Sequence, residues 1–177
     1  AAHAHYEPGL GDAVRAGVAS IEHGSLASME SLAEMKQRGT FMVMTANGIN
    51  MWKASGKYDE LPEYMQRKFD YVEAGLYETM QSVVDMGVKV AFGTDVAAQY
   101  GNREFALYVD QFGMLPLRAI RTATTDAAEL LEVTDRAKLE VGLLADVVAV
   151  PGNPLDNIKA LEDVRFVMKG GQVYKQP

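Results

Sequence analysis

The chain has 177 residues, 48% hydrophobic and 23% charged, which is the composition of a globular protein with room for one domain and a small appendage. Its 17 Lys and Arg against 24 Asp and Glu give a net charge of −7 with no basic cluster, so nucleic acid and membrane surfaces are not expected as partners. The absence of cysteine excludes disulfides and zinc–cysteine sites, fits a reducing compartment and leads us to expect a cytoplasmic location.

The first 45 residues predict alternating strands and helices. Residues 1–5 complete a strand, 7–17 form a short helix that ends in glycine, and 18–22 form a second strand. Apolar residues recur at helical spacing over 26–39, and the apolar, β-prone run at 40–45 predicts a third, buried strand.

The middle of the chain continues this alternation. Residues 46–57 contain Asn, Gly and Ser and predict a loop, which a long amphipathic helix over 64–85 follows. A fourth buried strand is expected over 88–92. Helices are then expected over 104–112 and 116–131, the latter beginning with proline in its first turn.

The tail differs, with a strand over 145–150, a short helical piece at 157–161 and a hairpin over 164–174.

The alternation of strands and helices in the residues before this tail predicts parallel strands with right-handed crossovers. An open doubly wound sheet and a (β/α)₈ barrel both fit this order. A barrel usually needs about 250 residues, so the chain would hold about four of its eight units.

Ionisable side chains fall where three of the predicted strands end. His3 and His5 end the first strand, His23 ends the second, and Asp95 follows the fourth. The carboxyl ends of parallel strands meet at one rim, and imidazole and carboxylate are the usual ligands of zinc. Each residue alone also fits a hydrogen-bonded strand end or a helix N-cap. A metal site accounts for their shared position.

Six motifs in chain order resemble the second half of an amidohydrolase-superfamily metal-dependent hydrolase. The branch they resemble includes imidazolonepropionase-like enzymes, Xaa-Pro dipeptidases and arginine/lysine carboxypeptidases. The motifs are AHAH at 2–5, AVRAGV at 13–18, SIEHG at 20–24, VAFGTD at 90–95, AIRTATTDAA at 119–128 and EVGLLAD at 140–146. Asp126 departs from the usual Asn of the family, but it touches no presumed ligand.

The resemblance implies a fold and a reaction. Residues 1–135 would form strands five to eight of a (β/α)₈ barrel, and 136–177 would form part of a small β-sandwich. His3, His23 and Asp95 would bind one or two divalent ions, expected to be Zn²⁺. A metal-activated hydroxide would attack an amide bond, with Asp95 as the proton shuttle.

The resemblance also implies a peptide-like substrate, either a dipeptide or an N-acyl amino acid. His5 matches a variable position near the substrate, and three residues after the last two barrel strands are expected to line its pocket. These are Trp52, Tyr100 and Arg103. Arg103 is the expected partner of a substrate carboxylate.

The family's strand-one His-x-His pair and its bridging lysine have no counterpart in the sequence. We therefore expect the chain to be the C-terminal part of an enzyme, completed by the N-terminal remainder of the barrel or by a homo-oligomer. The alternative is a non-catalytic half-barrel that only self-associates. An open-sheet ligand binder would need a glycine-rich phosphate loop, which the sequence does not contain.

Overall fold

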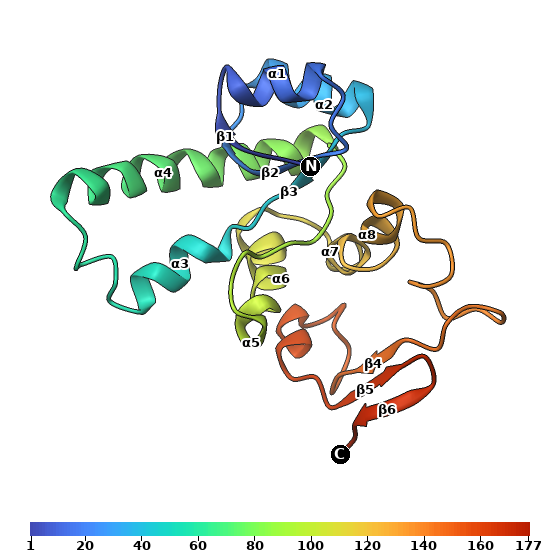
Figure 1. The fold of residues 1–177 in the computed structure, drawn as a ribbon. Helices are drawn as coiled ribbons and strands as arrows, with labels where there is room; N and C mark the ends of the chain where they lie inside the picture. Colours follow the sequence, from blue (N-terminus) through green and yellow to red (C-terminus); the bar gives the residue numbers. More distant parts are fainter.

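A parallel three-stranded sheet forms the centre of the N-terminal region in the computed structural model, which describes residues 1–177 (Figure 1). Its strands lie in the order β1 (Ala2–Tyr6), β2 (Ser20–Leu26) and β3 (Phe41–Val43). The crossovers are α1 (Gly9–Arg15) and α2 (Met29–Arg38), which pack against each other. The predicted strand–helix alternation is confirmed for this region.

The predicted fourth strand is correct in direction but wrong in length. Only Val90 forms a parallel bridge, with Met42 of β3. The Met42 N–H donates to the Lys89 carbonyl at 2.8 Å, and the Ala91 N–H donates to the Met42 carbonyl at 3.1 Å. The next amide, that of Phe92, donates instead to the Thr122 carbonyl at 2.9 Å, so the backbone leaves the sheet after one bridge.

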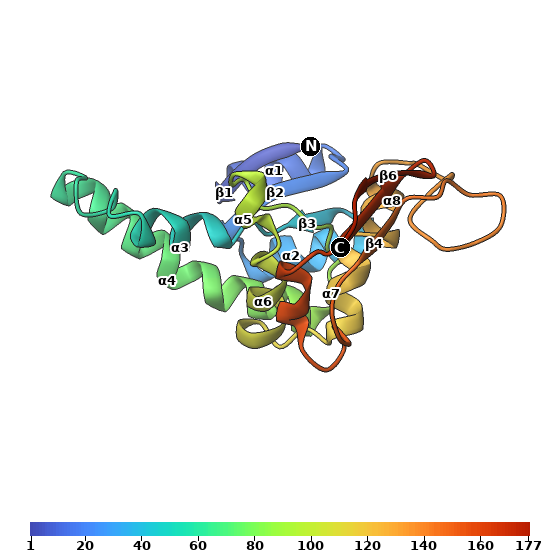
Figure 2. The ribbon, with the colours of Figure 1, turned by 90° about the horizontal axis from the view of Figure 1, so that it is seen from below.

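Two helices project from this body as an arm (Figures 1 and 2). The prediction of a loop over 46–57 is wrong, because α3 (Asn47–Ala54) lies within it. The long helix α4 (Glu63–Met86) agrees with its prediction and ends at Gly87 with φ +68°. Its C-terminal half packs on β2, where a Cβ on Gly75 would overlap the Leu26 side chain.

Short helices follow the arm: α5 (Ala98–Gly101), α6 (Glu104–Ala106) with the π-helical turn η1 (Leu107–Gln111), α7 (Pro116–Thr122) and α8 (Thr125–Leu130). The prediction of one helix over 116–131 is therefore wrong. Thr124 has φ −124° and ψ −96°, which no helix allows. The Thr122 and Thr124 hydroxyls donate to backbone carbonyls at 2.6 and 3.0 Å, and such bonds compete with helical pairing.

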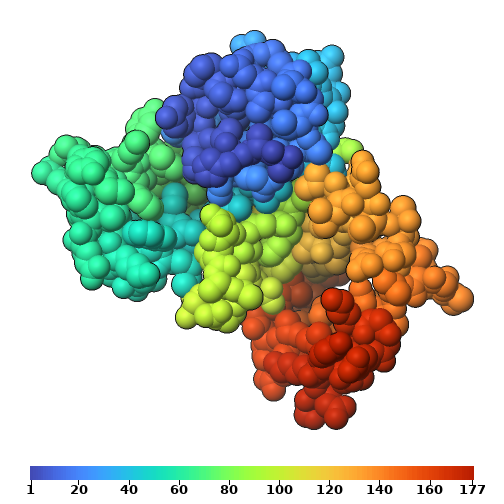
Figure 3. Space-filling view, in the orientation of Figure 1, coloured from blue at the N-terminus to red at the C-terminus, as the bar shows by residue number.

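An antiparallel sheet of β4 (Val147–Ala149), β5 (Phe166–Lys169) and β6 (Gln172–Lys175) confirms the predicted C-terminal hairpin. It forms a distinct mass at one end of the molecule (Figure 3). The 3₁₀ helix η2 (Ile158–Glu162) joins it to the body, since Ile158 enters the main core. None of the helices in the chain combines the length and the hydropathy of a membrane span.

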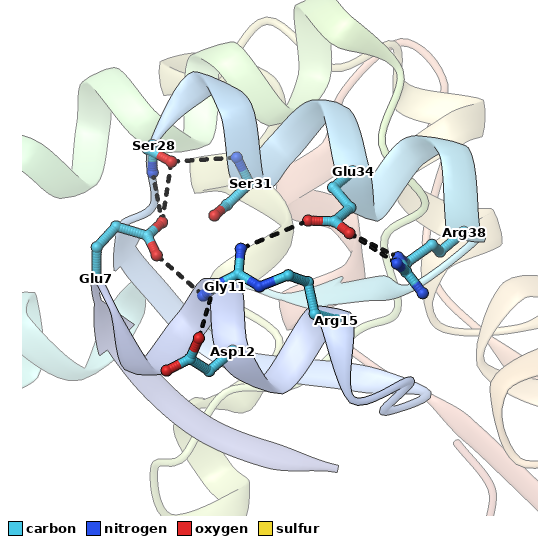
Figure 4. A network of polar contacts seen from close by, with 8 residues as sticks. All are labelled: Glu7, Gly11, Asp12, Arg15, Ser28, Ser31, Glu34 and Arg38. Atoms are coloured by element: carbon cyan, nitrogen blue, oxygen red, sulfur yellow. Dashed lines mark hydrogen bonds and ion pairs between the residues drawn. The ribbon is translucent and has the colours of Figure 1, made fainter.

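A carboxylate network fastens the two crossover helices to the end of β1 (Figure 4). Glu7 accepts hydrogen bonds from the Gly11 N–H at 2.9 Å and from the Ser28 N–H and hydroxyl at 3.2 and 3.0 Å. Burial alone raises the pKa of Glu7, but hydrogen bonds from Ser31, Ser28 and Gly11 outweigh burial and lower it overall. Glu7 is therefore most stabilising when it is ionised.

We predict that Glu7→Gln lowers the free energy of unfolding by about 1 kcal/mol at pH 7, because an amide cannot accept all three hydrogen bonds and partial exposure screens the loss. A carboxyl with a lowered pKa loses its contribution as the pH falls through that pKa. The difference between variant and wild type should therefore shrink below about pH 4. Urea unfolding at pH 7 and below about pH 4 measures the difference in the free energy of unfolding, and Glu140→Gln, at an exposed position, is the control. A difference that persists unchanged in acid would contradict the prediction.

Candidate metal centre

Three imidazoles from β1 and β2 form one cluster. His3 and His5 lie on the same side of β1, and Ala4 between them is in register with His23 of β2. The ring of His23 lies 4.4 Å from that of His3 and 4.7 Å from that of His5. One nitrogen of each residue lies within 4.8 Å of the others. Parallel pairing thus brings together residues that are about twenty positions apart.

Hydroxyl groups hold two of these imidazoles by the same ring nitrogen. The Nδ1 atom of His5 lies 3.1 Å from Ser25 Oγ, and that of His23 lies 2.7 Å from Thr45 Oγ1. These bonds leave Nε2 of each ring available for a cation. A metal-binding histidine typically uses its second nitrogen in such a bond.

The surroundings favour neutral rings. Burial is the largest cause that lowers the pKa of His5, and the neighbouring His23 and His3 add to it. Burial and then His3 lower the pKa of His23, while the negative charge of Asp95 acts in the opposite direction. Neutral imidazole is the form that binds zinc, so the donor set fits a divalent cation.

The cluster opens into a cavity of about 630 Å³. Asp95 lines the same cavity, although it is not a member of the 4.8 Å histidine cluster. Most of the apolar lining comes from the arm. These residues are Ile49, Met51, Trp52, Met65, Phe69, Val72 and Leu76. Imidazoles beside an apolar wall suit a substrate with one polar, reactive group and one apolar group.

Three residues that line the cavity have strained backbones. His23, Thr45 and Asp95 have φ values of +75°, +50° and +49°. Only two other non-glycine residues of the chain have positive φ. Each such residue costs about 1–3 kcal/mol and persists where the surrounding structure holds it. Strain is therefore concentrated at the rim where the polar side chains meet.

A buried carboxyl group anchors one side of this rim. Glu104 is fully buried and accepts hydrogen bonds from the backbone N–H groups of Ala46 and Asn47 at 2.6 and 2.8 Å. These amides begin α3, so Glu104 serves as its cap from 57 residues away. Burial raises the pKa of Glu104 to about 8, against the opposing effect of the two amide donors.

The predicted site residues are mostly brought together. His3, His5, His23, Asp95, Trp52 and Tyr100 all line the cavity. His5, expected at a substrate position, belongs to the nitrogen cluster itself. Arg103 lies outside the cavity, with its guanidinium 5.2 Å from the Tyr100 ring and 3.8 Å from Glu162. Sequence reasoning missed Thr45 and Glu104, because neither stands in a motif that indicates its role.

The sequence matches the model of the amidohydrolase family over residues 1–174. It is 34% identical to an ochratoxinase of Aspergillus niger over 184 aligned positions, which cover 99% of this chain and 38% of the relative. The chain thus spans less than half the length of the curated relatives it matches first.

Solved structures agree with this match. A Xaa-Pro dipeptidase with methionine bound in its active site superposes with a TM-score of 0.90 and 36% identity, covering 98% of this chain and 44% of that one. A prolidase complexed with N-methylphosphonate-L-proline gives a TM-score of 0.88 and 30% identity, covering 99% and 44%. The mixed α/β fold with its parallel sheet therefore corresponds to part of these structures.

We predict that Glu104 makes stability fall as the pH rises. Its pKa of about 8 in the folded chain exceeds the value of about 4.3 expected after unfolding, so the folded state binds the extra proton between these values. The contribution of Glu104 to the free energy of unfolding is complete below the unfolded-state pKa. It decreases as the pH rises toward the folded-state pKa, by at most about 1.4 kcal/mol per pH unit.

Glu104→Gln should remove the contribution of this residue to the pH dependence of the free energy of unfolding. Any destabilisation by the amide itself should be the same at every pH. Urea unfolding at several values from pH 5 to pH 8 measures the slope, and the exposed Glu60→Gln should retain that of the wild type. Equal slopes for wild type and Glu104→Gln would contradict the assignment.

Proposed function

Because the chain belongs to the amidohydrolase family, we propose that it carries part of the active site of a metal-dependent hydrolase that cleaves an amide bond in a small peptide-like molecule. The cluster of three imidazoles beside Asp95, in one cavity, is the observation that carries this proposal. The likeness to a Xaa-Pro dipeptidase and to an ochratoxinase supports it. The remaining ligands would come from further sequence or from a second copy.

His3 and His23 are the proposed nitrogen ligands, and Asp95 is the proposed carboxylate ligand. His5 adds a third imidazole to the same group. A zinc ion bound there supplies a Lewis acid and a nucleophile that is available at neutral pH. Ser25 and Thr45 orient two of the rings through Nδ1.

Asp95 is the proposed proton carrier. Its carboxylate accepts a proton from the attacking water as the new C–O bond forms at the amide carbon. It then gives that proton to the leaving nitrogen as the C–N bond breaks. The products are a carboxylic acid and an amine.

The cavity wall suggests how the substrate is held. Trp52 and Phe69, with ring centroids 5.5 Å apart, present aromatic surface to an apolar side chain of the substrate. Lys57 and Lys68 line the same cavity and are better placed than Arg103 to attract a substrate carboxylate.

We predict that His23→Ala lowers the zinc affinity of the chain by at least about tenfold, because one of the nitrogen ligands is lost. Equilibrium dialysis followed by elemental analysis measures bound zinc, and circular dichroism verifies that the variant is folded. Unchanged zinc binding would refute the ligand assignment. A tight homodimer that contains no zinc would instead favour a non-catalytic half-barrel.

Asp95→Asn tests the reaction. We expect kcat for Xaa-Pro dipeptides or N-acyl amino acids to fall by about 10²- to 10⁴-fold, since an amide cannot carry the proton. Steady-state kinetics on the shortest form of the protein that hydrolyses these substrates measures the effect. Asp85→Asn, on the exposed surface of α4, should keep wild-type turnover. An active Asp95→Asn enzyme would eliminate Asp95 as the proton carrier.

A further inference from the structure

We propose that the Thr45 hydroxyl is a positioning group that orients His23 toward the bound cation, and that Glu104 holds Thr45 in place. This inference rests on the proposed metal site and assigns a role to two residues outside the ligand set. Thr45 lies just beyond the end of β3, and Glu104 lies in α6.

The geometry at Thr45 indicates that this residue has a role beyond packing. The residue is half-buried, lines the cavity and has φ +50°, a conformation that glycine or asparagine adopts far more readily than a β-branched residue. Its Oγ1 atom lies 2.7 Å from Nδ1 of His23. A strained residue thus carries a hydroxyl to the ring of a proposed ligand.

His23 needs such support because its own backbone departs from regular strand geometry. Its φ is +75°, and Gly24 beside it has φ +59°. When Nε2 of His23 binds a cation, Nδ1 carries the ring proton, and this N–H donates a hydrogen bond to Thr45 Oγ1. The hydroxyl therefore fixes the ring orientation that directs Nε2 toward the cation.

Thr45 is itself held from both sides. Val43, two residues before it, is paired with Glu22 of β2. The two residues after it, Ala46 and Asn47, donate hydrogen bonds from their backbone N–H groups to the buried carboxyl group of Glu104 at 2.6 and 2.8 Å. The hydroxyl is therefore fixed between a strand pairing and a buried clamp, so that it can orient the imidazole without moving itself.

Thr45→Val tests the hydroxyl, because valine keeps the branched shape and removes the oxygen. Thr45→Ser retains the oxygen and should restore function. Thr40→Val is the matched control, since Thr40 is a buried threonine at the opposite end of β3 whose hydroxyl donates to the Val18 carbonyl at 3.3 Å. Zinc affinity by competition titration and the ¹⁵N shifts of the His23 ring in the metal-free chain are the two measurements.

We expect Thr45→Val to weaken zinc binding by about 10- to 100-fold and to shift the ¹⁵N resonance of His23 Nδ1, because that nitrogen loses its hydrogen-bond partner. Thr45→Ser and Thr40→Val should resemble the wild type in both measurements. Glu104→Gln, which replaces one acceptor oxygen with a donor, should weaken zinc binding less than Thr45→Val does. Unchanged affinity in Glu104→Gln would overturn the role of the clamp.

Wild-type affinity in Thr45→Val, or an equal loss in Thr40→Val, would overturn the role of Thr45 and leave the proposed function intact. A wild-type chain that binds no zinc would overturn the proposed function and this inference together.

Discussion

The parallel pairing of β1 with β2 is the constraint on which the site depends. It places the His3–Ala4–His5 segment beside His23, so that the imidazoles meet although an entire helical crossover separates them in the sequence. In this register His23 is paired with Ala4, which points to the side of β1 opposite His3 and His5, so regular strand geometry would turn His23 away from them. The left-handed backbone of His23, with φ +75°, changes the direction of its side chain. Strand pairing and this local departure together bring the three imidazoles into one group.

Several residues around this edge violate local preferences, and distant contacts sustain them. Thr45 and Asp95 have left-handed backbones, and Glu104 keeps a carboxyl group where no solvent reaches it. Each arrangement is unfavourable alone and becomes possible through its neighbours, such as the two amides that point at Glu104. The energetic cost is concentrated at the cavity, as is typical where geometry matters for chemistry.

Sequence patterns predicted the elements that local signals define. Apolar spacing and Gly39 identified α2. The alternation of strands and helices led us to expect His3, His5, His23 and Asp95 where strands end; all four line one cavity, but His3 and His23 lie within β1 and β2 rather than at their ends. Helix α3 escaped prediction because its cap is Glu104, far away in the chain, rather than a residue beside its first turn.

The break between α7 and α8 lies at Thr124, where threonine hydroxyls bond to backbone carbonyls within the same segment. The shortened fourth strand reflects the hydrogen bond from the Phe92 N–H to the Thr122 carbonyl, a tertiary contact that no local pattern reveals. Thr45 could not be recognised as a neighbour of His23 for the same reason: the two are 22 residues apart and meet only through the sheet.

The arm formed by α3 and α4 has a consequence for how this protein can diversify. Trp52 packs near Phe69, and Lys53 forms an ion pair with Glu73, so the two helices behave as one unit attached to the sheet. The histidines lie outside this unit. Substitutions in the arm can therefore change the apolar lining of the cavity without altering the histidine cluster, so the two parts can vary independently during evolution.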